Sequence, residues 1–127
     1  MLHRDYILDL IDQFMMVVLE ALRHALQQHD QQSAEEAEEA IANLLDLDPE
    51  FALDLAPDSL VTMMLLSGMA DSVADYVGFT LEKLSEAYEG MGAEDLARLR
   101  HAQAEAVAES FGCDLQTPPE GLEGLAN

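Results

Sequence analysis

Apolar residues recur along most of this chain at intervals of three and four, which is the spacing of amphipathic helices. The longest such segment is Asp5 to Gln28. One apolar stripe runs through Ile7, Leu10, Ile11, Phe14, Val17, Val18 and Ala21, and a second through Leu8, Met15, Leu19, Leu22 and Leu26. The two stripes merge at Met15–Leu19, so the helix is apolar almost all round at its middle. That pattern is typical of a helix at the centre of a core or between two subunits. We favour the core, with the subunit interface as the alternative.

Turn and capping residues divide the following part of the chain into shorter helical segments. Ser33 and Glu36 have the spacing of a capping box, which predicts that a second helix opens at Ser33. Asp48-Pro49 and Pro57 are typical helix starts, and they predict a short helix over 49–55 and another over 57–67.

Two longer helices are expected over about 70–89 and 94–111, joined by the turn Gly90-Met91-Gly92. Gly112 stands where a glycine commonly ends a helix, and Gly78 inside the first of the two indicates a close approach of another element. No segment has the alternation of a β-strand. We therefore predict an all-α fold, an antiparallel bundle of five to six helices over residues 1–112.

The totals fit one domain and a reducing compartment. The chain has 127 residues, of which half are hydrophobic, enough for a sizeable core. Residues 113–127 contain two prolines and two glycines without an apolar pattern, so we expect a flexible tail. Cys113 is the only cysteine, which rules out an intramolecular disulfide. Acidic residues among the first ten do not match a secretion signal, and we expect a cytoplasmic protein.

The charge is strongly one-sided, with 26 acidic and five basic residues and a formal net charge of −21. Nucleic acid and anionic membrane surfaces are therefore disfavoured as partners, because both require clustered Lys and Arg. The unbroken apolar run Phe14–Leu19 is far shorter than the ~20 residues of a membrane span. The acidity fits a solubilised surface, which we favour, a surface that docks a basic partner, or a salt-adapted cell. In each case self-repulsion predicts stabilisation by salt or mildly lower pH.

The turn near residue 90 is flanked by apolar, aromatic and small residues at set spacing, which are Leu84, Ser85, Tyr88, Gly92, Ala97 and Ala104. This pattern resembles that of a tetratricopeptide repeat. His101 stands where the repeat usually has an aromatic residue. The resemblance covers about a quarter of the chain and implies a helical hairpin, while a generic antiparallel helix pair explains the same residues. Stable arrays of such repeats need about three copies.

The chain opens with two short elements, Arg4-Asp5-Tyr6-Ile7 and then Ile11-Asp12-Gln13. They resemble the R-D-Y-I and I-E-Q elements with which a family of short, all-helical bacterial proteins begins. A later segment, Leu45 to Leu60, is loosely similar. The family carries no assigned activity, so the resemblance implies a helical fold and no chemistry.

Known catalytic and metal-binding motifs are missing from the sequence. His24 and His101 each form an i, i+4 pair with a glutamate, but the spacings of di-iron and zinc sites are not present. Cys113 follows a helix C-terminus, where the dipole disfavours a thiolate. We therefore predict no metal, no cofactor and no enzymatic activity. The alternative is a small helical-bundle enzyme or ligand- or metal-binding protein, and it requires His24 and His101 to meet in one buried pocket with carboxylates.

The apolar excess of two helices carries the functional prediction, which is a non-enzymatic protein–protein interaction or adaptor module. The possible interaction surface consists of Met15, Met16, Leu19, Met63, Met64 and Tyr88. Methionine suits an adaptable groove, although the same side chains also serve as core filler. We expect a protein partner with a basic segment, together with self-association as a homodimer.

Overall fold

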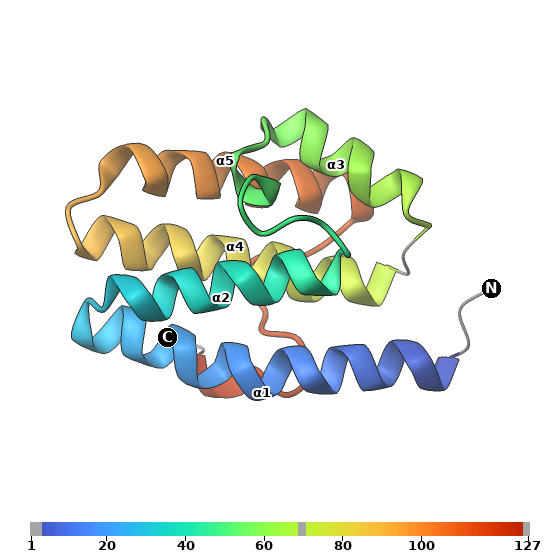
Figure 1. Cartoon of the computed structure of the whole chain (residues 1–127), viewed down its shortest axis with the longest axis horizontal. Coiled ribbons are helices and arrows are strands. Elements are labelled where there is room, and N and C mark those ends of the chain that lie inside the picture. The colour runs from blue at the N-terminus through green and yellow to red at the C-terminus, as the bar shows by residue number, and fades with distance from the viewer. Residues whose placement is uncertain (1–3, 69–70, 126–127) are drawn as a thin grey trace.

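The computed structural model describes residues 4–68 and 71–125, and every regular element within these ranges is a helix. Its elements are α1 (Arg4–Gln28), α2 (Gln31–Leu44), the 3-10 turn η1 (Ala52–Asp54), α3 (Pro57–Leu66), α4 (Asp71–Gly90), α5 (Glu94–Phe111) and the 3-10 turn η2 (Glu123–Leu125). The predicted all-α bundle is confirmed, with α1 antiparallel to α2 and α4 antiparallel to α5 (Figure 1). None of the described helices has the length and apolar content needed to cross a membrane.

Helix α4 forms the centre of the bundle. It packs against α5, α1 and α2, and its side chains are buried on several sides, including Tyr76, Leu81 and Tyr88 (Figure 1). The expectation that the first helix is central is therefore wrong. Helix α1 packs mainly against α2 and α4, and the C-terminal segment with η2 covers part of another side, but its outer side stays open and Met16 there is 79% exposed. Periodicity measures how apolar a helix is, whereas the number of neighbours depends on how the chain folds back.

Two helix starts differ from the sequence predictions. Asp30 caps α2 three residues before Ser33, because its carboxylate accepts the backbone N–H of Gln32 at 3.2 Å and the Ser33 hydroxyl at 2.7 Å. The short helix expected over 49–55 is reduced to η1. The Asp48 carboxylate accepts the N–H of Glu50 at 2.9 Å, an Asx turn that competes with helix formation.

The α4–α5 hairpin is tightly packed. The Ser85 hydroxyl donates to the Ala97 carbonyl at 2.7 Å, which ties the two helices together near the turn. The predicted close approach at Gly78 is confirmed, since a Cβ there would lie 3.4 Å from Val107 and 3.3 Å from Leu115. The buried face of α5 consists of Ala97, Arg100, Gln103, Ala104 and Val107, while Ala102 is exposed.

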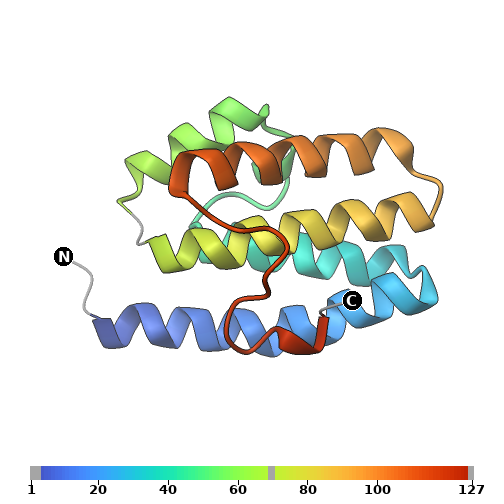
Figure 2. The same cartoon turned by 180° about the vertical axis from the view of Figure 1, so that it is seen from behind.

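The segment after α5 crosses α4 and reaches α1 (Figure 2). Leu122 and Leu125 lie in the core, and the Tyr76 hydroxyl donates to the carbonyl of Glu120. Gly121 approaches α1 so closely that a Cβ would lie 2.1 Å from the Met15 sulfur. The sequence pattern did not reveal these contacts. The flexibility expected of residues 113–127 concerns motion and stays a prediction.

Candidate functional site

A surface groove runs between α1 and α2 and widens toward the end of α3. It consists of three adjoining hollows, one at the wide end, one in the middle and one at the narrow end. The wide and middle hollows share Leu10, Asn43 and Leu44, and the middle and narrow hollows share Val17, Ala40 and Asn43. The wide end has a volume of about 590 Å³. We call this feature the α1–α2 groove.

Exposed apolar side chains surround the wide end of the α1–α2 groove. Tyr6 is 51% exposed, Met63 is 40% exposed and Leu66 is 78% exposed. Val17, at 45% exposure, continues the apolar lining toward the narrow end. Several large apolar side chains that meet at one hollow indicate a binding surface more strongly than the same side chains scattered singly.

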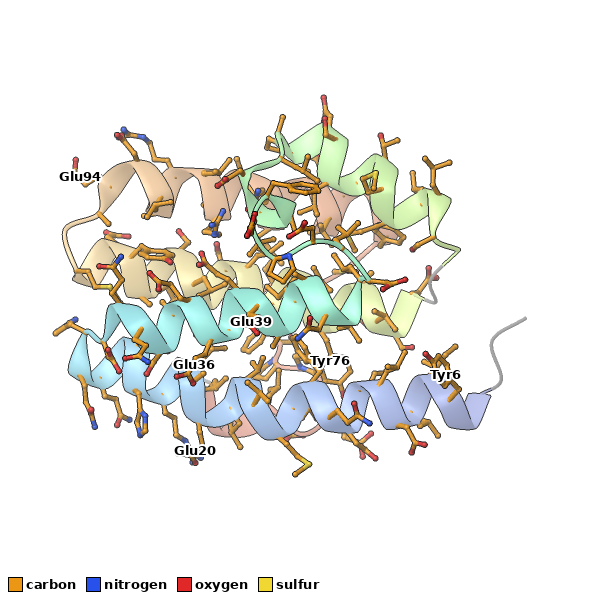
Figure 3. All side chains as sticks on the ribbon, in the orientation of Figure 1. Tyr6, Glu20, Glu36, Glu39, Tyr76 and Glu94 are labelled. Carbon is orange, nitrogen blue, oxygen red and sulfur yellow. The ribbon has the colours of Figure 1, made fainter. Side chains whose placement is uncertain are left out.

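The charged side chains described along the groove are acidic. Glu36 and Glu39 line its narrow end and Asp46 its wide end, and the lining residues that the structure describes include no Lys or Arg. Figure 3 shows Glu36 and Glu39 on the side of α2 along the groove, with Tyr6 near the start of α1. The groove therefore combines an apolar floor with negative charge at both ends.

The basic side chains that the structure describes are engaged elsewhere with carboxylates. Arg23 lies 3.1 Å from Glu20, Lys83 lies 3.3 Å from Glu86, Arg100 lies 2.7 Å from Glu38, and Arg98 pairs with Asp95. None of these four cations lines the groove. The carboxylates of the groove thus have no cationic partner among them.

The interaction residues predicted from the sequence fall into three environments. Met16 and Met63 are exposed, but only Met63 lines the groove. Met15 and Leu19 are partly buried beneath the C-terminal segment, against Gly121 and Gly124. The remaining two, Met64 and Tyr88, belong to the core at 1% and 2% exposure. The structure does not bring the six together into one surface.

A buried polar cluster lies on the inner side of α5, and the sequence interpretation missed it. Arg100 donates to Glu38 on α2 at 2.8 Å through Nε, to the Leu53 carbonyl at 2.6 Å and to the Gln103 side chain at 3.1 Å. Gln103 in turn donates to the carbonyls of Leu53 and Leu55 at 3.0 and 2.9 Å. This cluster fastens η1 to α5 and α2. Residues 45–47, which residues 48–51 connect to η1, form one wall of the groove.

Tyr88 completes the cluster from α4. Burial, reinforced by the charge and hydrogen bond of Glu38, raises the pKa of its hydroxyl well above 10. The phenol is therefore protonated at any physiological pH, and it donates to Glu38. Glu38 is thus held by both Arg100 and Tyr88, which suits a structural anchor. A sequence signal for the cluster did exist, since Arg100 and Gln103 share helical spacing with Leu96 and Val107, and polar residues in an apolar stripe require buried partners.

The histidines do not meet. His24 on α1 is half exposed and lies 3.9 Å from Glu20, while His101 on α5 is half exposed and lies 2.7 Å from Glu82 and 3.2 Å from Glu105. The hydrogen bond and charge of Glu82 raise the pKa of His101, against a smaller opposing effect of burial. The described residues thus do not form the pocket that the enzyme or metal-binding alternative requires, and no group of three potential metal ligands is found among them.

Cys113 is held as a thiol. Burial raises its pKa to about 12, and the hydrogen bond and negative charge of Asp75 add to the effect. A thiol with this pKa is a poor nucleophile because the thiolate is the reactive form.

Comparison with protein-family models, with curated proteins and with solved structures finds no match for the chain.

Proposed function

We propose that this protein is a non-enzymatic protein-binding module whose α1–α2 groove receives a basic segment of a partner. The observation that carries the proposal is that three exposed apolar side chains, Tyr6, Met63 and Leu66, line the same hollow. Large exposed apolar patches with polar surroundings are typical of interaction surfaces. The acidic residues at both ends of the groove favour a partner with Lys or Arg.

The buried cluster supports a binding role that uses a preformed surface. Arg100 and Gln103 hold the backbone at Leu53 and Leu55 through short hydrogen bonds. Nearer the groove, the wall residues Leu45 and Leu47 are bonded to α2, since their N–H groups donate to the carbonyls of Ile41 at 3.0 Å and Ala42 at 2.9 Å. A wall held in this way loses less conformational entropy on binding. Self-association as a homodimer is a second form of the same role, and the experiment below separates it from binding to another protein.

The resemblances support no more specific function. The tetratricopeptide-like hairpin and the R-D-Y-I opening are compatible with a helical binding module, and neither supplies a partner. We retain the family resemblance as a proposal about ancestry, based on Arg4-Asp5-Tyr6-Ile7 and Ile11-Asp12-Gln13.

The test is site-specific photo-crosslinking in the cell that makes the protein. A photoreactive amino acid replaces Met63, which lines the groove, and in a matched control it replaces Leu65, which is exposed on the same helix and does not line it. A discrete adduct with another polypeptide from position 63 alone is expected. The same adducts from both positions, or none from position 63, would contradict the proposal.

Light scattering coupled to size-exclusion chromatography, at low and high salt, separates the two forms of the role. A monomer is expected if the groove serves a different protein. A salt-stable dimer that Leu66→Gln dissociates would assign the groove to self-association instead.

A further inference from the structure

The walls of the α1–α2 groove restrict the backbone conformation of what it binds. Amides and carbonyls within α1 and α2 are bonded along their own helices, so the groove offers an extended peptide no row of partners. Extended peptides are bound through such a row at a sheet edge, and residues 4–68 and 71–125 contain no strand. An α-helix satisfies its own backbone and requires only side-chain packing from the groove.

The lining residues of α1 set the length of that helix. Tyr6, Leu10, Gln13 and Val17 recur at helical spacing along one face. At a rise of 1.5 Å per residue, they extend over about 16 Å, which corresponds to about three turns of a partner helix. The wide end, with a volume of about 590 Å³, suits a bulky apolar anchor, whereas the narrower hollows of about 170 and 190 Å³ suit smaller side chains.

Charge decides between a second copy of this chain and a different, basic helix. A symmetric dimer through the groove would place the same patch on both sides of the interface. Glu36, Glu39 and Asp46 would then face the same carboxylates, in two chains that each carry a formal charge of −21. Lys or Arg on a partner helix removes this repulsion and pairs the carboxylates.

We propose that the occupant of the groove is a single amphipathic α-helix of about three turns, with its apolar face in the groove and Lys or Arg beside Glu36 and Glu39. This inference rests on the protein-binding role proposed above and names the class of partner. The bulky anchor of the helix lies at the wide end, between Tyr6, Met63 and Leu66. Its basic residues extend past the narrow end, where the two glutamates lie on α2.

The test uses synthetic peptides and the full chain in a fluorescence-anisotropy titration. The probe peptide has about 14 residues, with Leu and Phe at i, i+4, i+7 and i+11 and Lys elsewhere. A shuffled peptide of the same composition measures non-specific attraction to an acidic protein, and a peptide with Glu in place of Lys measures the contribution of charge.

Paired variants locate the binding surface. Val17→Gln and Leu66→Gln change the groove, while Met16→Gln and Leu65→Gln change exposed neighbours on the same helices that do not line it. All four side chains are at least 45% exposed, so the variants should keep the fold, which far-UV circular dichroism checks. The groove variants should weaken binding of the probe by about fivefold or more, and the neighbours by less than about twofold.

A second pair of variants tests the position of the basic residues. The double variant Glu36→Gln/Glu39→Gln should weaken the probe about threefold and flatten its salt dependence, whereas Glu94→Gln/Glu109→Gln should alter neither by as much. The inference is overturned if the shuffled peptide binds as tightly as the probe, or if groove and neighbour variants behave alike. A homodimer that depends on the groove would also overturn the inference of a basic helix, while the protein-binding role would stand. Absence of crosslinks from position 63 would contradict the protein-binding role itself.

Discussion

Replacing Arg100 by Met should destabilise the protein more than any exposed charge substitution. The Arg100 side chain is 4% exposed, and its partner Glu38 is 17% exposed. The variant keeps the apolar stem and loses the guanidinium, so Glu38 is left in a mostly buried position without its cation. The Leu53 carbonyl and the Gln103 side chain each lose one donor as well.

The magnitude follows from what remains buried. Removing one partner of a buried ion pair costs about 3–5 kcal/mol, because the other charge is left uncompensated. Domains of this kind unfold at a cost of about 5–15 kcal/mol, so the variant loses a large share of its stability. The melting temperature should fall by about 10 °C or more.

The assay is urea denaturation followed by circular dichroism, with Arg98→Met as the matched control. Arg98 lies on the same helix, is 73% exposed and pairs with Asp95, so its loss should cost less than about 0.5 kcal/mol. The double variant Glu38→Met/Arg100→Met should recover about half of the loss, since it removes the unpaired charge. If Arg100→Met unfolds the chain, Gln103→Met provides a milder test, with an expected cost of about 1–3 kcal/mol.

Two results would refute the reasoning. One is a cost for Arg100→Met no larger than that for Arg98→Met. The other is a Glu38→Met/Arg100→Met variant whose loss of unfolding free energy equals the sum of the losses in Glu38→Met and Arg100→Met. Partners in contact should instead show a coupling energy of about 0.5–3 kcal/mol. Either result would mean that the buried cluster does not anchor η1.

Three further predictions concern pH, the C-terminal segment and salt. The pKa of His101 is raised above its ordinary value of 6.5, so its stabilising effect is full below that pH and is lost as the pH rises through the folded-state pKa. His101→Gln should therefore lose more stability in urea at about pH 5.5 than at about pH 8, and equal losses would contradict this. Gly121→Ala should lower the free energy of unfolding more than Gly112→Ala. Both glycines have positive φ, of 95° and 72°, but only Gly121 faces a side chain. If the C-terminal segment were free in solution, the Gly121 substitution would instead be the harmless one. Salt screens the repulsion among unpaired carboxylates, so the melting temperature should rise between about 20 mM and about 500 mM NaCl. An unchanged melting temperature would show that the charges are too dispersed to matter.

The sequence by itself determined the fold class and most of the helix boundaries. Periodicity is local, and strong helix signals decide where a helix begins and ends. The helix Glu94–Phe111 with Gly112 at its end is the clearest case, since Gly112 adopts the left-handed conformation typical of that position. The acidic charge, which drives the choice of a basic partner, is likewise a property of composition alone.

Only the tertiary structure decided which apolar residues are covered. Helix α1 was expected at the centre, but α4 lies there because three helices pack around it. Met64 is buried and Met63 is exposed although they are neighbours on one helix, and this difference depends on how α3 lies against α5. Likewise, no local pattern brings Arg100 to Glu38, which lies 62 residues earlier in the chain. Local sequence specifies the apolar stripe of each helix, whereas the long-range packing of the helices determines which part of that stripe becomes core and which part lines a groove.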